Sequence, residues 1–123
     1  MLRIAETLYG LQIRERHDMQ LWHDDVTYYE ILENGELIAS FYLDPYARAN
    51  KRGGAWMADC RVRRRRPDGS LQKPVAFLTC NFNPPVDGQP ALLTHDEVTT
   101  LFHEFGHGLH HMLTRIEVAA VSG

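Results

Sequence analysis

The spacing of apolar residues changes twice along the chain, from a helical period to a strand period and back. Residues 1–9 show the helical spacing, which predicts a short helix that ends near Gly10. Residues 25–82 hold runs of β-branched and aromatic residues that are typical of strands. Residues 95–113 return to the helical spacing. Strands followed by one long helix indicate an α+β fold.

A β-hairpin is the clearest prediction in the strand region. Val26–Leu32 and Leu37–Leu43 flank Asn34-Gly35, and this dipeptide favours a type I′ turn because both of its residues tolerate positive φ. Neither strand alternates cleanly between apolar and polar residues, so we expect other parts of the structure to cover both faces. Asp44-Pro45 is expected to end the second strand.

Two further strands are expected after a loop over residues 46–55, where paired glycines let the backbone approach a neighbour closely. Ala55–Val62 and Val75–Phe82 have the composition of strands. Between them, the basic run Arg63–Arg66 leads into a turn. We expect a solvated hairpin tip there, because no aromatic residues interleave with the arginines to stack on RNA bases. The four strands predict a small antiparallel sheet.

The long helix predicted over residues 95–113 begins with a capping box. Thr94 is the expected N-cap, and Glu97 stands three residues later, where its side chain can return to the backbone of the cap. An apolar stripe predicts the face that packs on the sheet: Val98, Phe102, Phe105, Leu109 and Met112. The adjoining face carries three histidines: His103, His107 and His110.

Composition limits the class of protein without specifying its chemistry. The 123 residues are 44% apolar and 24% charged with a net charge of −3, which suits one domain or part of one. This balance gives no reason to expect a nucleic-acid or membrane partner, and neither a membrane span nor a signal peptide is predicted. Cys60 and Cys80 lack C-x-x-C spacing, so we expect two buried, reduced thiols in a cytosolic protein.

His103-Glu104-Phe105-Gly106-His107 is an H-E-x-x-H pentad inside the predicted long helix. Two histidines at i and i+4 lie on one side of a helix, one turn apart, so their imidazoles can bind the same zinc ion. Glu104 lies beside them, where it can take a proton from water at the metal. The pentad therefore predicts His103 and His107 as zinc ligands and Glu104 as a general base.

A catalytic zinc usually has three protein ligands, and the chain offers no convincing third one. His110 and His111 lie roughly 11–12 Å along the helix from His103, too far for ligands of one ion. The extended metzincin motif is excluded because His and Leu occupy positions 110 and 113. An alternative is a deformylase-like metallohydrolase with Cys60 as the third ligand, although Cys60 lacks the glycine and leucine flanks of that class.

Four stretches carry a pattern more specific than the pentad alone: Ser40–Arg48, Lys51–Met57, Pro74–Phe82 and Thr94–His110. Together they strongly resemble the thimet-oligopeptidase-like (M3) zinc peptidases, in particular the bacterial oligopeptidase A branch. The resemblance covers nearly all of residues 5–123 and is weakest at the arginine run.

The resemblance implies a cytosolic zinc oligopeptidase that cuts short peptides and, in bacteria, cleaved signal peptides. Carried over residue by residue, it makes His103 and His107 the zinc ligands and Glu104 the general base, with one zinc per full-length catalytic domain. It also implies that substrate backbone pairs by strand addition with one strand. The residues of that strand are Ala76, Phe77, Leu78, Thr79, Cys80 and Asn81.

The resemblance further implies that parts of the site lie outside this sequence. Members of the family are several times longer and mostly helical. Their third ligand is a Glu about 25 residues after the second histidine, a position beyond Gly123. We therefore expect residues 1–123 to form part of a catalytic domain. The competing hypothesis is an inactive fragment that binds metal weakly through two histidines.

Overall fold

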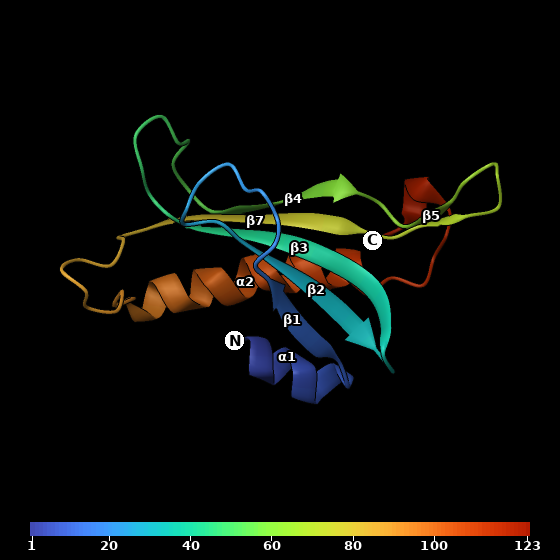
Figure 1. Cartoon of the computed structure of the whole chain (residues 1–123), viewed down its shortest axis with the longest axis horizontal. Coiled ribbons are helices and arrows are strands. Elements are labelled where there is room, and N and C mark those ends of the chain that lie inside the picture. The colour runs from blue at the N-terminus through green and yellow to red at the C-terminus, as the bar shows by residue number, and fades with distance from the viewer.

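A five-stranded sheet with one long helix against it organises the chain (Figure 1). The computed structural model describes residues 1–123. In chain order the elements are α1 (Leu2–Tyr9), β1 (Gln12–Arg16), β2 (Thr27–Glu33), β3 (Glu36–Tyr46), β4 (Trp56–Arg61), β5 (Arg64–Arg65), β6 (Leu71–Gln72), β7 (Val75–Phe82), α2 (His95–Met112) and the 3-10 helix η1 (Ala119–Val121). None of the helices combines the length and the apolar character needed to cross a membrane.

The β2–β3 hairpin confirms the predicted turn and corrects the predicted end of its second strand. Asn34 and Gly35 both have positive φ, 52° and 79°, as a type I′ turn requires. β3 continues through Asp44-Pro45 to Tyr46. The proline is tolerated because the pairing of β3 with β7 is irregular between Asp44 and Tyr46, where the ladder needs no N–H from Pro45.

The sheet is mixed, which corrects the antiparallel sheet predicted from the sequence. Its strand order is β1-β2-β3-β7-β4, with β7 parallel to β3 and antiparallel to β4. After β3 the chain forms the outer strand β4 and the β5–β6 ribbon, and it then returns as β7 between β3 and β4. Composition indicates that a segment is a strand but does not specify its neighbours, so local pattern could not reveal the parallel pair.

β1 is an edge strand that the hydrophobic pattern does not reveal, because most of its residues are polar or charged. It pairs with β2 through both backbone and side chains. Arg14 Nη2 and Arg16 Nη1 lie 2.7 and 3.1 Å from Oε1 of Glu30. The hydrogen bond from Arg14, supported by Arg16, outweighs burial and holds the pKa of Glu30 below its ordinary value.

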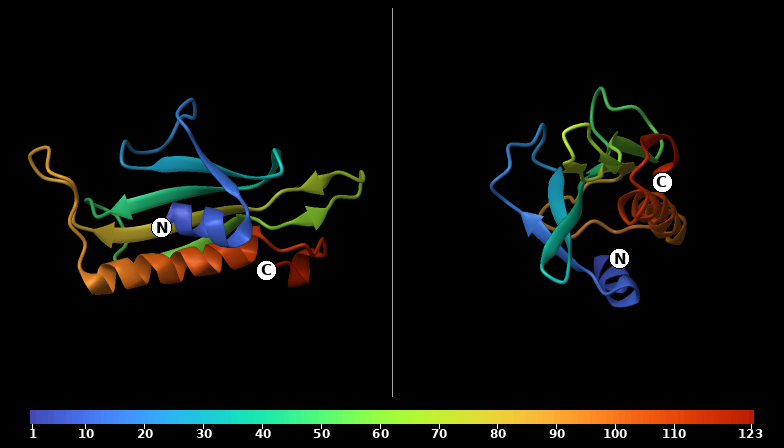
Figure 2. Two further views of the ribbon diagram at one scale, coloured as in Figure 1. Left: turned by 90° about the horizontal axis from the view of Figure 1, so that it is seen from below. Right: turned by 90° about the vertical axis from the view of Figure 1, so that its right-hand side faces the viewer.

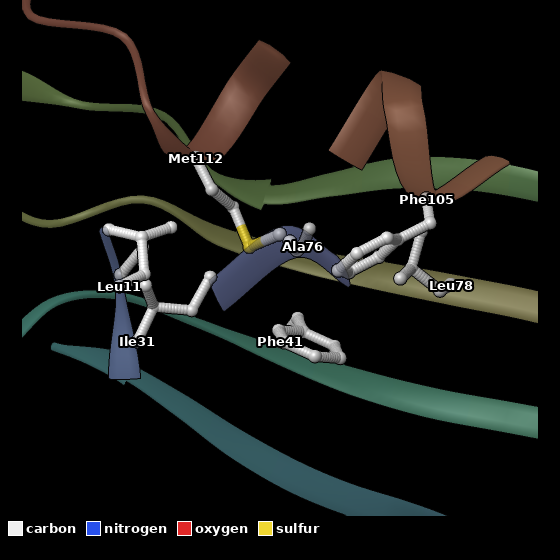
Figure 3. Packing of buried hydrophobic residues seen from close by; sticks show 9 residues of the cluster. Leu11, Ile31, Phe41, Ala76, Leu78, Phe105 and Met112 are labelled. Atoms are coloured by element: carbon white, nitrogen blue, oxygen red, sulfur yellow. The ribbon is translucent and has the colours of Figure 1, made fainter. Parts of the chain in front are cut away.

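The hydrophobic core lies between the sheet and α2 (Figures 2 and 3). Phe41 on β3 is buried beneath α2, with its ring centroid 5.7 Å from that of Phe105. Phe105 and Met112, two residues of the predicted apolar stripe, are buried. Val98 and Phe102, nearer the start of the helix, are 37% and 39% exposed. The sheet therefore covers the later turns of the stripe.

The opposite face of the sheet is covered by aromatic side chains. The loop between β1 and β2 lies on the side of the sheet away from α2 (Figure 2). Its Trp22 places its ring centroid 5.3 Å from Tyr42 and 5.8 Å from Phe77. The central strands thus have neighbours on both faces, as the lack of clean alternation predicts.

The arginine run supplies the first strand of the β5–β6 ribbon, which confirms the predicted hairpin. Arg64 and Arg65 are exposed. Arg65 also donates from Nη2 and Nε to the two carboxylate oxygens of Glu117, at 2.8 and 3.1 Å. Arg63 Nη2 lies 3.5 Å from Oε1 of the same carboxylate, so two arginines of the run tether the segment that follows α2.

Candidate metal and peptide-binding site

The pentad lies in the middle of α2, whose start is defined by the predicted capping box. The backbone N–H of Glu97 donates to Thr94 Oγ1 at 3.1 Å, and the N–H of Thr94 donates to Glu97 Oε1 at 3.0 Å. α2 then continues without interruption to Met112. His103 and His107 therefore occupy successive turns of a regular helix and project from the same side.

The imidazoles of His103 and His107 converge. Their Nε2 atoms lie 3.1 Å apart, and the ring planes are 83° from parallel. Two nitrogens at about 2.0–2.1 Å from one tetrahedral zinc lie roughly 3.3 Å apart, so the observed pair fits two ligands of one ion. Both histidines are exposed, which leaves room for further ligands. No group of three His, Cys, Asp or Glu side chains in the chain is arranged to hold a metal.

Glu104 is a residue of α2 and lies on the side of the helix that faces the start of β4. It is half-buried and, with His107, lines an open depression of about 360 Å³ whose other wall is formed by Trp56 and Met57. β4 is the last strand of the sheet, so its outer backbone edge has no strand partner. A carboxylate, an imidazole and an unpaired strand edge therefore lie around one hollow.

His110 and His111 do not join the convergent pair. His110 is exposed and lies at the same depression as Glu104. His111 is 2% exposed, and its Nε2 lies 2.9 Å from the carbonyl oxygen of Arg61. Because a carbonyl can only accept, Nε2 of His111 is the donor. This hydrogen bond fastens the end of β4 to α2.

β7 lies inside the sheet, which corrects the substrate-pairing role expected for residues 76–81. Both of its backbone edges are occupied, one by β3 and one by β4, so no edge is left for a substrate strand. Its side chains alternate between the two faces. The buried ones, which point into the core, are Ala76, Leu78 and Cys80; the half-buried ones on the opposite face are Phe77, Thr79 and Asn81.

The two cysteines differ in exposure. Cys80 is fully buried, and its burial, together with the charge of Glu104, raises the pKa of the thiol to about 11. Cys60 on β4 is exposed, which corrects the prediction of two buried thiols, and both cysteines are free. Cys60 forms no three-ligand group with the pentad histidines, so the structure does not assemble the deformylase-like alternative.

A buried ion cluster at the end of β3 is not identified by sequence reasoning. Arg48 Nη1 and Nη2 donate to the carboxylate of Asp44 at 2.8 and 3.0 Å, and Lys51 Nζ lies 3.0 Å from Asp44 Oδ1. Burial by itself would raise the pKa of Asp44, but these hydrogen bonds outweigh it and hold the pKa below its ordinary value. The sequence signal that could have revealed this cluster is an aspartate in an apolar strand, followed by basic residues four and seven positions later.

Comparison with known proteins places the chain in a family. The model of Peptidase family M3 matches residues 1–123. The chain is 65% identical over 124 residues to oligopeptidase A of Escherichia coli (strain K12), and 43% identical over 122 residues to dipeptidyl carboxypeptidase of the same organism. It is also 43% identical over 129 residues to an organellar oligopeptidase A, chloroplastic/mitochondrial, of Arabidopsis thaliana.

These alignments cover 100%, 97% and 100% of the chain, in the same order, but only 18%, 17% and 16% of the relatives. The chain thus spans less than a fifth of the length of the proteins it matches. The family model, in contrast, matches the whole chain, from Met1 to Gly123. The chain belongs to peptidase family M3.

Proposed function

We propose that this chain is part of the catalytic centre of a zinc-dependent peptidase that hydrolyses short peptides. The observation that carries the proposal is the convergence of His103 and His107, whose Nε2 atoms lie 3.1 Å apart, next to Glu104. Membership of peptidase family M3 supports peptide-bond hydrolysis as the reaction.

His103 and His107 would hold the zinc through their Nε2 atoms. Neutral imidazole nitrogens are common zinc ligands, and the observed separation suits two of them on one ion. A third protein ligand would come from elsewhere, since the chain has no third side chain in reach of the pair. Zinc bound there would supply a Lewis acid that polarises the peptide carbonyl and lowers the pKa of water.

Glu104 is the proposed general base. Its carboxylate lines the depression that also holds His107, so it can reach water and substrate in that hollow. Glu104 accepts the proton of the attacking water as the water oxygen bonds to the peptide carbonyl carbon. It then donates the proton to the amide nitrogen as the C–N bond breaks, so one carboxyl serves both steps.

The unpaired edge of β4 is the proposed binding element for the peptide backbone. A peptide added to this edge as a strand would pass the depression that contains Glu104 and His107. Main-chain pairing is largely independent of side chains, which suits a peptidase that acts on varied short peptides, including cleaved signal peptides. In this proposal β7 does not pair with the peptide; it pairs with β4 and so holds that strand in place.

A cytoplasmic location, without nucleic-acid or membrane partners, belongs to the same proposal. Its support is the balanced composition of the chain. Family membership does not decide the location, since two Arabidopsis relatives are named as an organellar and as a probable cytosolic oligopeptidase A.

A chimera tests the proposed chemistry. Residues 1–123 would replace the matched segment of E. coli oligopeptidase A, which is 65% identical to them. We expect the zinc-loaded chimera to cleave a quenched fluorescent peptide, and Glu104→Gln to retain zinc while it loses about 10²–10⁴-fold in kcat. Glu97→Gln on the same helix is the matched control, because glutamine preserves the capping box. Normal turnover by Glu104→Gln with zinc bound would contradict the assigned base.

The second candidate concerns the 123 residues by themselves. Because they contain two convergent ligands and no group of three, they fit a weak zinc-binding segment without peptidase activity. Zinc titration and a peptide-cleavage assay on the isolated chain separate the two cases. Tight 1:1 zinc binding together with turnover would show that a third ligand lies within the chain.

A further inference from the structure

The loop over residues 47–55 carries the chain from β3 to the outer strand β4, and its first half is tied to the end of β3. The side chain of Lys51 is 5% exposed, and its Nζ donates to the carbonyl oxygens of Asp44 and Tyr46 at 3.1 and 2.7 Å. The same Nζ also reaches the carboxylate of Asp44, which Arg48 holds from the other side. The path of the chain out of β3 is therefore closely determined.

The second half of the loop is tied to β7 by a single side chain. Nδ2 of Asn81 donates to the carbonyl oxygens of Arg52 and Gly54, at 2.8 and 2.6 Å. The backbone pairing of β4 with β7 begins at Trp56, opposite Thr79. Continued by two residues, that register places Gly54 opposite Asn81. The carboxamide thus replaces the backbone ladder at the point where the ladder stops.

The backbone at this point is sharply turned. Gly54 has φ of 92°, a conformation that residues with a side chain rarely adopt. Next to it, the guanidinium of Arg52 lies 4.6 Å from the centroid of the Trp56 ring. Trp56 in turn forms one wall of the depression that contains Glu104. The contacts of Asn81 therefore determine where the free edge of β4 starts relative to the pentad.

We propose that Asn81 is a positioning residue for peptide binding, because it holds Arg52 and Gly54 so that the first residues of β4 face the depression at Glu104. Asn81 lies on the face of the sheet away from the core and acts through the loop, without touching the peptide. The inference rests on the proposed function, since it requires the peptide to pair with the edge of β4.

Kinetics of Asn81 variants in the zinc-loaded chimera test this inference. Asn81→Ala is expected to raise KM about tenfold for a peptide long enough to pair with β4, with kcat little changed, because uniform binding is lost. Asn81→Gln keeps the N–H donors and should recover most of the wild-type KM. Asn81→Asp keeps the shape but presents an ionised carboxylate to two carbonyl oxygens, so it should behave like Asn81→Ala.

Asn83→Ala is the matched control, since Asn83 is an exposed residue of the same type two positions further on. A fall in kcat with unchanged KM for every peptide would mean loss of folded enzyme and would overturn the positioning role. If Asn81→Ala does not fold, Asn81→Gln and Asn81→Asp carry the comparison, and equal KM values for them overturn the inference. An unsubstituted chimera that binds zinc but cleaves no peptide overturns the proposed function itself, and the inference with it.

Discussion

The backbone of Gly108 packs so close to Leu78 that a Cβ on the glycine would lie 3.1 Å from Cδ2 of the leucine. Gly106, two residues earlier on α2, is in the opposite situation, since a Cβ there would meet no atom within 4 Å. The helix that carries the pentad therefore approaches β7 through one glycine and presents the other to open space. The spacing between helix and sheet depends on the absence of a side chain at residue 108.

Substitutions at these two glycines should change stability in opposite directions. Gly108→Val is expected to lower the free energy of unfolding by about 1–3 kcal/mol, because the added methyl groups overpack the contact with Leu78. Gly106→Ala is expected to raise it by roughly 0.5–1 kcal/mol, because alanine is the better helix former. Urea denaturation of the 123-residue chain measures both values. A destabilising Gly106→Ala would mean that residue 106 is packed rather than open.

Zinc binding should depend on two histidines of α2 and not on a third. His103→Ala and His107→Ala are each expected to weaken zinc binding by more than about a hundredfold, since each removes one of the two proposed ligands. His110→Ala should leave the affinity nearly unchanged, because His110 lies outside the convergent pair. Competition with a chromogenic chelator gives the affinities. A similar loss in all three variants would contradict the two-ligand geometry.

The two thiols should react at very different rates. At pH 8 the Cys80 thiol stays protonated, because its pKa is raised to about 11 by burial, and its sulfur is also inaccessible. Cys60 is exposed and should react readily with a thiol-specific chromogenic disulfide. The native chain is expected to release about one equivalent of chromophore, and the unfolded chain two. Rapid release of two equivalents from the native chain would show that β7 is accessible.

The Asp44 cluster should make stability depend on pH in the acid range. The folded-state pKa of Asp44 is lowered, so its ion pairs contribute fully above the ordinary pKa of about 3.9 and are lost as the pH falls through the folded value. Asp44→Asn should therefore be clearly less stable than the wild type at pH 7, and the difference should narrow below about pH 4. Denaturation at pH 7, 5 and 3 measures this difference in the free energy of unfolding, with the substitution of an exposed aspartate, Asp24→Asn, as the control. An equal difference at pH 3 and pH 7 would contradict this role.

Elements with local signals were predicted accurately. The turn at Asn34-Gly35 and the start of α2 at Thr94 agree with the structure, because a type I′ turn and a capping box are made by residues close in sequence. The arrangement of the pentad is also set by residues close in sequence. Helical periodicity alone brings His103 and His107 to the same side of α2, and their convergence needs no other element.

Elements that depend on distant partners were predicted incompletely. Most residues of β1 are charged or polar, so the sequence pattern gives no sign of a strand. β1 is held in the sheet by its pairing with β2, where Arg14 and Arg16 meet Glu30. The position of β7 between β3 and β4 also has no local signal, so sequence patterns predict an antiparallel sheet and do not show that both edges of β7 are paired. The hydrogen bonds of Asn81 join residues at least 27 positions apart, and nothing in the sequence near Asn81 indicates them.

The sequence by itself determined the hairpin, the α+β class and the placement of His103, Glu104 and His107 together on one helix, because each depends on contacts within a few residues. The tertiary structure alone decided which strand presents a free edge to the pentad. That edge belongs to β4, held by Asn81 at its start and by His111 at its end. The physical reason is that every strand offers the same backbone groups for pairing, and only the order of the strands decides which of those groups remain unpaired.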